Sequence, residues 1–441
     1  MSNRPETNKQ SCPVYKKCGG CQLQNLSYPE QLEFKQKKVE KLLKRFCTVE
    51  KIIGMKTPYH YRNKVQAAFY TDKKGKIISG VYQSGSHHVV GIDSCQTEDV
   101  IADKIIVAVR KLLPSFRMTT YNEDTGKGFL RHILVKRGFA TNQIMLVLVT
   151  GTPVFPSKNN FVKAILKQFP EITTIVQNIN PYRTNLVLGD NQKVLYGKGY
   201  IEDILCGCRF RISPKSFYQI NPVQTEVLYG KAIEFANLKC NETVLDTYCG
   251  IGTIGIIAAK NGAGNVIGAE LNGDAVRDAI VNARANNLKN IRFYKADAGE
   301  FMREAADEDE KPDVVFMDPP RAGSDRKFLD SLIKMSPKKV VYVSCNPETL
   351  ARDLAYLTQN SPYKAQKIQP VDMFPHTAHI ETVVLLSHKK PDGHINVKVE
   401  FGEGEGKVPL DNIAKRAEEY KPKERVTYKM IKEYIEAKYG F

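Results

Sequence analysis

The stretch VLDTYCGIGTIG, residues 244–255, decides the fold of the larger part of the chain. An apolar run ending at Asp246 predicts a strand, and glycines at 250, 252 and 255 form a Gly-x-Gly-x-x-Gly turn that opens a helix. Such glycines let a ligand approach the backbone at the carboxyl end of a strand. By itself the turn fits a nicotinamide site, an S-adenosylmethionine site or a tight packing turn.

Strands and helices alternate on both sides of this turn, from about residue 206 to residue 390. The expected parallel strands are 243–247, 265–270, 291–294, 314–317 and 340–343. Residues 365–372 and 380–386 would add edge strands. This alternation predicts a doubly wound α/β domain, a Rossmann-like parallel sheet with helices on both faces.

Four further features end or begin strands at the same sheet edge. Glu270, twenty residues after Gly250, is placed to bind ribose hydroxyls. The sequence DPPR, residues 318–321, has Arg321 where methyltransferases acting on amines usually carry an aromatic residue, so amine methylation is disfavoured. Cys345 ends the next strand, and we expect a catalytic thiol whose pKa falls near a helix amino terminus and basic groups.

The last of these motifs is FPHTAHIE, residues 374–381, which puts Glu381 at the head of the final strand. It is equally compatible with a catalytic carboxylate and with a polar strand start.

The charge of the chain is concentrated in its first part. Of 441 residues, 42% are hydrophobic and 26% charged, which excludes a disordered or fibrous chain and suggests two or three domains. The net charge is +17, and residues 1–200, with 31 basic and 14 acidic side chains, carry all of the excess. This concentration of positive charge predicts a module that binds a polyanion, with nucleic acid as the leading candidate. The alternative is a charged surface that only contacts solvent.

The predicted organisation has three parts. Residues 1–205 are expected to form a basic, mixed, β-rich RNA-binding domain, with a helix over 29–45 and otherwise mostly strands. Residues 206–390 form the doubly wound domain, and residues 391–441 are an extension of unknown role. The expected strands of the first part include 65–70, 133–136, 144–149 and 174–178.

Four of the ten cysteines stand out by their spacing. Cys12, Cys18 and Cys21 lie close together, and Cys95 is a candidate fourth thiolate. Four thiolates suit zinc or an iron–sulfur cluster, and the ligands alone do not decide between them. No apolar leader and no membrane-length apolar run is found in the sequence, so we expect a cytoplasmic protein without membrane contact. Cys47, Cys240 and Cys249 receive no role, and Cys206 and Cys208 are expected in the core.

Taken together, these motifs resemble the RNA (uracil-5-)-methyltransferases, specifically the bacterial 23S rRNA branch that carries an iron–sulfur cluster. The resemblance covers about residues 12–387. Besides the cysteine set and the segments 246–252 and 344–347, it rests on SFYQINP at 216–222, DPPRAG at 318–323 and HIE at 379–381.

The resemblance implies roles for single residues. Cys345 would be the nucleophile and Glu381 the base in methylation of uridine carbon 5 through a covalent intermediate. Thr253 stands where relatives often have Asn. The implied S-adenosylmethionine site is Gln219, Tyr248, Glu270, Asp297 and Asp318, and the implied [4Fe–4S] ligands are Cys12, Cys18, Cys21 and Cys95.

Alternatives remain at this stage. Within the class, a tRNA T-loop uridine methyltransferase is the nearest rival, and the cysteine set favours the 23S rRNA branch. A nicotinamide oxidoreductase would leave Asp318 and Cys345 without roles. A non-catalytic iron–sulfur protein that binds RNA would explain the charge and the cysteines. RNA is the expected partner, and a monomer without an obligate protein partner is expected.

Overall fold

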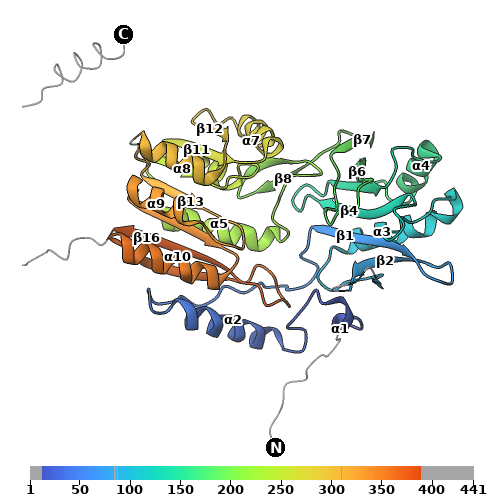
Figure 1. The fold of residues 1–441 in the computed structure, drawn as a ribbon, viewed down its shortest axis with the longest axis horizontal. Helices are drawn as coiled ribbons and strands as arrows, with labels where there is room; N and C mark the ends of the chain where they lie inside the picture. Colours follow the sequence, from blue (N-terminus) through green and yellow to red (C-terminus); the bar gives the residue numbers. More distant parts are fainter. Residues whose placement is uncertain (1–11, 84–85, 87, 309, 389–441) are drawn as a thin grey trace, which may run out of the picture. The chain divides into compact units, whose positions relative to one another are not determined.

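Two seven-stranded sheets organise the part of the chain that the computed structural model describes, residues 12–388 apart from 84, 85, 87 and 309 (Figure 1). Both sheets belong to one unit of the chain, Met1–Lys389. The second unit, Lys390–Phe441, lies outside the described residues, and so does the extension expected over 391–441.

The first sheet has the order β3-β2-β1-β4-β5-β6-β7 and is antiparallel except between β5 and β6. Its central strands β4 and β5 are buried almost throughout because apolar clusters cover both of their faces. The elements are β1 (Lys64–Thr71), β2 (Ile77–Tyr82), β3 (Val89–Gly91), α3 (Val100–Leu112), η1 (Pro114–Phe116), β4 (Leu130–Arg137), β5 (Ile144–Thr150), α4 (Lys158–Gln168), β6 (Ile172–Ile179) and β7 (Asn191–Tyr196).

The second sheet has the order β12-β11-β10-β13-β14-β16-β15, and its first five strands are parallel. Strands β16 and β15 complete it in antiparallel register. The strands are β10 (Thr243–Asp246), β11 (Asn265–Glu270), β12 (Ile291–Lys295), β13 (Val314–Met317), β14 (Lys339–Ser344), β15 (Tyr363–Val371) and β16 (Glu381–His388). The strand order reverses at β10 and β13, which is where ligands bind in such sheets.

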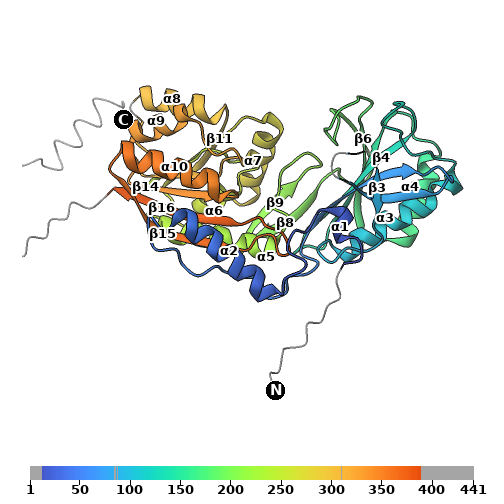
Figure 2. The same cartoon turned by 60° about the horizontal axis from the view of Figure 1, so that its bottom comes forward.

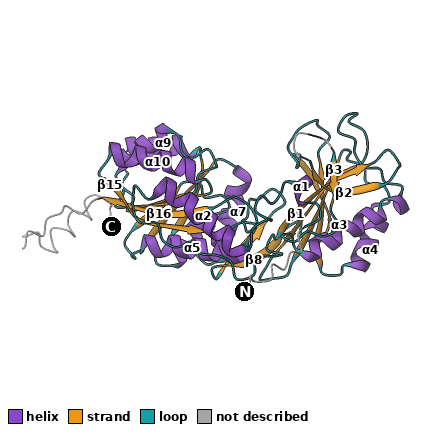
Figure 3. Ribbon diagram, turned by 90° about the horizontal axis from the view of Figure 1, so that it is seen from below, coloured by secondary structure: helices purple, strands orange, loops and turns teal. Residues whose placement is uncertain are grey.

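Helices cover both faces of the second sheet (Figure 3). One apolar cluster joins it to α5 (Pro222–Ala236), α6 (Thr253–Lys260) and α7 (Gly273–Ala285). The other joins it to α8 (Ala298–Asp307), α9 (Arg326–Met335) and α10 (Pro347–Asn360). The Rossmann-like doubly wound fold is therefore confirmed.

The segment before the first sheet packs against the second. After α1 (Tyr15–Cys18), α2 (Tyr28–Leu43) starts at a capping box in which Ser27 and Glu30 satisfy each other's backbone N–H groups. Helix α2 contacts α10 and β15, and it lies beside them in Figures 1 and 2. The hairpin of β8 (Ile201–Leu205) and β9 (Cys208–Ile212) follows the first sheet, and the predicted domain boundary at 205 stays a prediction.

The expected elements have counterparts, and the structure contains further elements that were not expected. The helix expected over 29–45 is α2, and the seven strands expected after residue 206 are β10 to β16. Helices α3 and α4 were not foreseen, because residues 50–200 were interpreted mostly as strands. No described helix combines the length and the apolar character that crossing a membrane requires.

Candidate active site

The glycine turn after β10 is shaped by close packing. Gly252 has a φ of +82°, and a Cβ there would lie 2.8 Å from the Phe293 ring, so this position requires glycine. One carboxylate oxygen of Asp246 accepts a hydrogen bond from the Gly255 N–H at 2.8 Å. The other, Oδ1, is buried and has no hydrogen-bond partner among the described residues. A buried acceptor in this state fits a ligand that donates to it.

Glu270 ends β11 beside this turn. Its carboxylate accepts hydrogen bonds from the N–H groups of Gly250, at 3.1 Å, and Asn272, at 2.7 Å. Both Gly250 and Glu270 line a pocket of about 500 Å³, here called the large pocket, together with Phe217, whose ring is 63% exposed. This volume suits a nucleoside-sized ligand. Of the five residues predicted to bind the cofactor, Glu270 alone is in the lining.

Gln219 and Thr253 meet through a residue that the sequence analysis missed. Tyr229 on α5 is buried, and its hydroxyl lies close to the side chains of Gln219 and Thr253. Burial and the nearby carboxyl of Asp318 raise the pKa of Tyr229. The only signal in the sequence was its place on the helix that follows the segment SFYQINP.

Tyr248 and Asp297 lie on the α8 and α9 side of the second sheet. The Tyr248 hydroxyl is 3.4 Å from Ser324 Oγ, and its ring packs against Phe328 with centroids 5.5 Å apart. Asp297 caps α8, because its carboxylate accepts hydrogen bonds from the N–H groups of Gly299 and Glu300. The charge of Asp297 acts on Tyr248, so the two side chains are neighbours.

Three strand boundaries bring Asp318, Cys345 and Glu381 together. Asp318 follows β13, Cys345 follows β14 and Glu381 begins β16. Burial raises the pKa of Asp318 to about 7. Burial and the charge of Asp318 raise the pKa of Glu381 well above its usual value, although Arg321 lowers it. These are the properties of a closed acidic site.

The expectation of a lowered pKa at Cys345 is wrong. Burial first, then the charges of Glu381 and Asp318, raise the pKa of this thiol to about 11, and the opposing effect of Arg321 is smaller. The helix that follows begins only at Pro347, after its N-cap Asn346. Without a ligand, the thiol is therefore protonated at neutral pH.

Cys345 lines a pocket of about 150 Å³, the thiol pocket, with Lys38, Arg321 and His379. Arg321 Nη2 lies 3.4 Å from His379 Nε2. Lys38, which comes from α2, pairs with Glu348 at 2.9 Å. Lys38 was not singled out from the sequence, because nothing in the pattern of α2 distinguishes it from its neighbouring lysines.

The four selected cysteines lie around one small pocket, which Cys12, Cys18, Cys21 and Cys95 all line. Each is partly exposed and in no disulfide. Burial raises the pKa of Cys95 to about 11, with a further contribution from Glu98. Over residues 12–388, as far as they are described, no three His, Cys, Asp or Glu side chains form a group that could hold a metal ion. The thiols are thus neighbours without a closed ligand shell.

The sequence and fold match known proteins. The model of a family described as tRNA (uracil-5-)-methyltransferase matches residues 184–389. An uncharacterized RNA methyltransferase of Bacillus cereus is 44% identical over 388 residues, which cover 87% of this chain and 84% of the relative. A second, from Listeria monocytogenes, is 46% identical over 379 residues, covering 85% and 83%.

Among solved structures, this chain is similar to the tRNA (uracil-54, C5)-methyltransferase of Pyrococcus abyssi in complex with S-adenosyl-L-homocysteine. The TM-score is 0.71 and the sequence identity 30%, with 83% of this chain and 85% of the other covered. The matched part of this chain is longer than the part that forms the second sheet and its helices.

Proposed function

The chain belongs to the RNA (uracil-5-)-methyltransferase family, and from this premise we propose that it methylates carbon 5 of a uridine in 23S rRNA. It is an S-adenosylmethionine-dependent RNA methyltransferase. The observation that carries the proposed chemistry is the meeting of Asp318, Cys345 and Glu381 at the edge of the second sheet.

The proposed cofactor residues fit a cationic ligand. S-adenosylmethionine supplies an electrophilic methyl group on a positively charged sulfur. Burial raises the pKa of both Asp246 and Asp318 to about 7, so a positive charge beside them would favour their ionised forms. The proposed set remains Gln219, Tyr248, Glu270, Asp297 and Asp318.

Cys345 is the proposed nucleophile because uracil carbon 5 is too electron-poor to accept a methyl group unaided. The thiolate bonds to carbon 6, and the electrons of the 5,6 double bond move into an enolate. Carbon 5 would then attack the methyl group, whose bond to sulfur breaks so that S-adenosylhomocysteine leaves. Arg321, which lowers the pKa of Cys345, favours the reactive thiolate. The thiol pocket supports this proposal because it gives a bound base access to Cys345.

Glu381 is the proposed base that completes the reaction. Its carboxylate takes the proton from carbon 5, the 5,6 double bond re-forms, and the Cys345 sulfur leaves as thiolate. Burial keeps the pKa of Glu381 high, which suits a carboxylate that must accept a proton. The target uridine must leave its stack to reach this site.

Two RNA substrates compete for the assignment. The similarity to 23S rRNA enzymes through Cys12, Cys18, Cys21 and Cys95 favours rRNA. A tRNA substrate is the second candidate, because the similar Pyrococcus protein is described as a tRNA (uracil-54, C5)-methyltransferase.

A direct comparison of substrates tests this assignment. Transcripts of 23S rRNA and of tRNA are incubated separately with the protein and S-adenosylmethionine carrying a labelled methyl group, and modified positions are mapped by mass spectrometry. We expect 5-methyluridine in 23S rRNA and none in tRNA. Label at uridine in the tRNA T-loop alone would replace the rRNA proposal with the second candidate.

We also propose a [4Fe–4S] cluster on Cys12, Cys18, Cys21 and Cys95. The support is a donor set made only of thiols around one pocket. Protein purified without oxygen is expected to contain four iron and four sulfide per chain, in keeping with the cluster's composition, and Cys95→Ser is expected to lose them. Stoichiometric zinc without sulfide would contradict the cluster.

A further inference from the structure

The loop between β15 and β16, residues 372–380, leads directly into the proposed base, Glu381. It closes the hairpin in which Val371 pairs with Glu381, and it carries His379 into the thiol pocket. Much of the loop is buried, including Asp372, His376 and Thr377. A buried loop needs partners for its polar groups, and helix α2 supplies several of them.

A charge pair fixes the start of the loop. Lys35 on α2 and Asp372 form an ion pair at 2.5 Å, and both side chains are fully buried. The Lys35 ammonium also donates to the Phe374 carbonyl at 3.0 Å. The Tyr28 hydroxyl donates to the second oxygen of Asp372 at 2.8 Å. These contacts fix residues 372–374 against α2.

Gln31 holds the middle of the loop at His376. The His376 N–H donates to Gln31 Oε1 at 2.9 Å, while Gln31 Nε2 lies 3.2 Å from His376 Nδ1. The other ring nitrogen of His376 is 2.9 Å from the Pro58 carbonyl, so it carries the proton and Nδ1 accepts from Gln31. His376 has a φ of +68°, which a residue other than glycine keeps only when its surroundings enforce it.

The segment that follows the cysteines reaches the same loop. The Leu23 N–H donates to the His376 carbonyl at 2.9 Å, and the Ala378 N–H donates to Gln22 Oε1 at 3.2 Å. Gln22 Nε2 in turn donates to the Gly19 carbonyl at 2.7 Å. Residues 22–35 therefore contact the loop from its first residue to Ala378, three residues before Glu381.

We infer that Gln31 is a positioning residue for the second half of the reaction, an inference that rests on the proposed function. By holding His376 in its left-handed conformation, Gln31 sets the path of the loop into Glu381 and His379. Loss of this contact displaces the base while Cys345, which follows β14 and not the loop, stays in place. The covalent adduct then still forms and methyl transfer still occurs, but removal of the carbon 5 proton and release of Cys345 slow down.

This leads to a specific expectation for Gln31→Met, which keeps the side-chain length and removes the contacts with His376. With ordinary uridine-containing RNA, the variant accumulates a covalent protein–RNA adduct that survives a denaturing gel, and wild type shows little. Turnover falls about tenfold to a hundredfold, the effect typical of misplaced catalytic groups. The dissociation constant for S-adenosylmethionine stays unchanged, because none of the proposed cofactor residues lies on the loop.

Two matched variants complete the experiment. Gln31→Glu keeps the acceptor for the His376 N–H, and we expect it to accumulate less adduct than Gln31→Met. It also serves as the test variant if Gln31→Met does not fold, and it is then compared with wild type. Gln36→Met makes the same change on the same helix, where Gln36 accepts from the Ile52 N–H, away from the loop, and should behave like wild type.

The outcomes separate this inference from the function on which it rests. If wild type forms no adduct even with 5-fluorouridine RNA, the proposed function fails. If wild type forms that adduct but the Gln31 variants accumulate none with ordinary RNA, the inference is overturned. The inference is also overturned if the Gln31 variants lose cofactor binding and turnover together, because Gln31 would then have a purely structural role.

Discussion

The acidic side chains at the edge of the second sheet determine the electrostatics of the candidate site. Asp246 is fully buried and Asp318 is partly buried, and desolvation is the main reason that their pKa values rise to about 7. The same desolvation, with Glu381 and Asp318, keeps the Cys345 thiol protonated. A cationic ligand would offset this excess of acidic groups.

Cofactor affinity should therefore depend on pH. A raised carboxyl pKa means that Asp318 is protonated below about pH 7, and a cationic ligand prefers the ionised form. We expect the affinity for S-adenosylmethionine to fall as pH drops below 7, by up to about tenfold per unit for one required ionisation. Calorimetry between about pH 5.5 and 8.5 measures this, with Asp318→Asn as control. An affinity that is flat in wild type would contradict the expected ionisation.

The reactivity of Cys345 gives a second test at single residues. Arg321 lowers the pKa of this thiol, so Arg321→Gln should raise it and leave less thiolate at about pH 8.5. Alkylation of the Cys345 peptide by iodoacetamide, followed by mass spectrometry, should be slower than in wild type. Arg326→Gln, which removes an arginine that stacks on Tyr356, is the matched control. Equal rates in all three proteins would exclude Arg321 as a source of activation.

At the scale of elements, the sequence predicted the second sheet well because glycines and strand-end motifs mark each boundary. Strands β11 and β13 coincide with the expected ranges. Helix α3 was missed because its many β-branched residues favour a strand, although its buried residues follow a helical period. The contact of α2 with the loop at 372–380 could not be predicted for another reason. The partners of α2 in this loop, Asp372 and His376, lie more than 300 residues away in the sequence.

The residues of the candidate site could be predicted from the sequence in part, as the elements of the fold could. The meeting of Asp318 and Cys345 followed from strand ends, since parallel strands gather their carboxyl ends at one edge, and Glu381 begins the antiparallel strand β16 beside β14. The sign of the pKa shift at Cys345 was not predictable, because it depends on burial and on two carboxyls distant in the chain. Lys38 reaches the thiol pocket, and Tyr229 reaches Gln219 and Thr253, only through helix packing.

The docking of α2 should depend on its buried charge pair. Lys35→Met leaves the Asp372 carboxylate buried without its counter-ion, and removing one partner of a buried pair costs about 3–5 kcal/mol. We expect unfolding in urea at a correspondingly lower concentration, with recovery in Lys35→Met combined with Asp372→Asn. Lys37→Met, at an exposed position on the same helix, should leave the transition unchanged. No loss of stability in Lys35→Met would show that the pair does not stabilise the fold.

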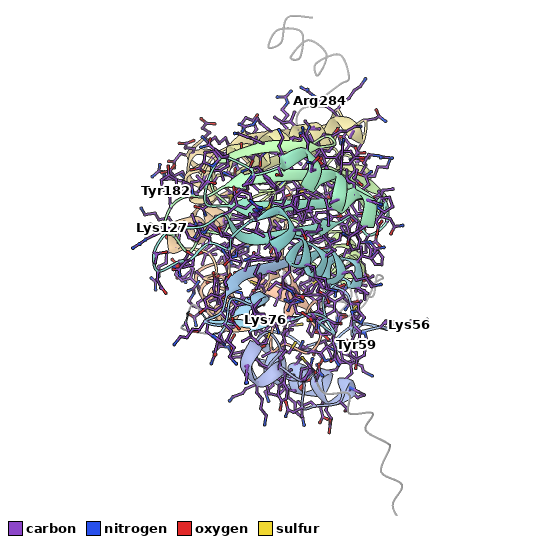
Figure 4. The ribbon with its side chains drawn as sticks, turned by 90° about the vertical axis from the view of Figure 1, so that its right-hand side faces the viewer. Lys56, Tyr59, Lys76, Lys127, Tyr182 and Arg284 are labelled. Carbon is purple, nitrogen blue, oxygen red and sulfur yellow. The ribbon has the colours of Figure 1, made fainter. Side chains whose placement is uncertain are left out.

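For the whole molecule, nearly all of the excess positive charge of residues 1–200 lies outside α2, which has four lysines against three glutamates. Helix α2 nevertheless contacts the second sheet and brings Lys38 to the thiol pocket. Figure 4 labels exposed side chains from residues 1–200, among them Lys56, Lys76 and Lys127 with the aromatic rings of Tyr59 and Tyr182. Cations beside exposed rings suit phosphate contact and base stacking.

RNA affinity should accordingly fall as salt rises. The logarithm of the affinity is expected to decrease linearly with the logarithm of salt, and removing one lysine that binds a phosphate should flatten the slope by about 0.7. The triple variant Lys56→Glu, Lys76→Glu and Lys127→Glu should weaken binding and flatten the slope. As a control, the charges of three exposed residues in the part of the chain that forms the second sheet are reversed: Lys289, Arg303 and Lys327. This control should change the RNA affinity and the salt slope less than the triple variant does. An RNA affinity that does not change with salt would contradict RNA binding through phosphate contacts.

Covalent attack of Cys345 on a uridine can be detected as an adduct with RNA containing 5-fluorouridine. Fluorine at carbon 5 cannot leave as a proton does, so the thioether should persist in the presence of S-adenosylmethionine. We expect a protein–RNA band on a denaturing gel for wild type and for Cys240→Ala, an exposed cysteine, and none for Cys345→Ala. A band that persists in Cys345→Ala, or methylation of ordinary RNA without any adduct on fluorinated RNA, would contradict covalent attack by Cys345.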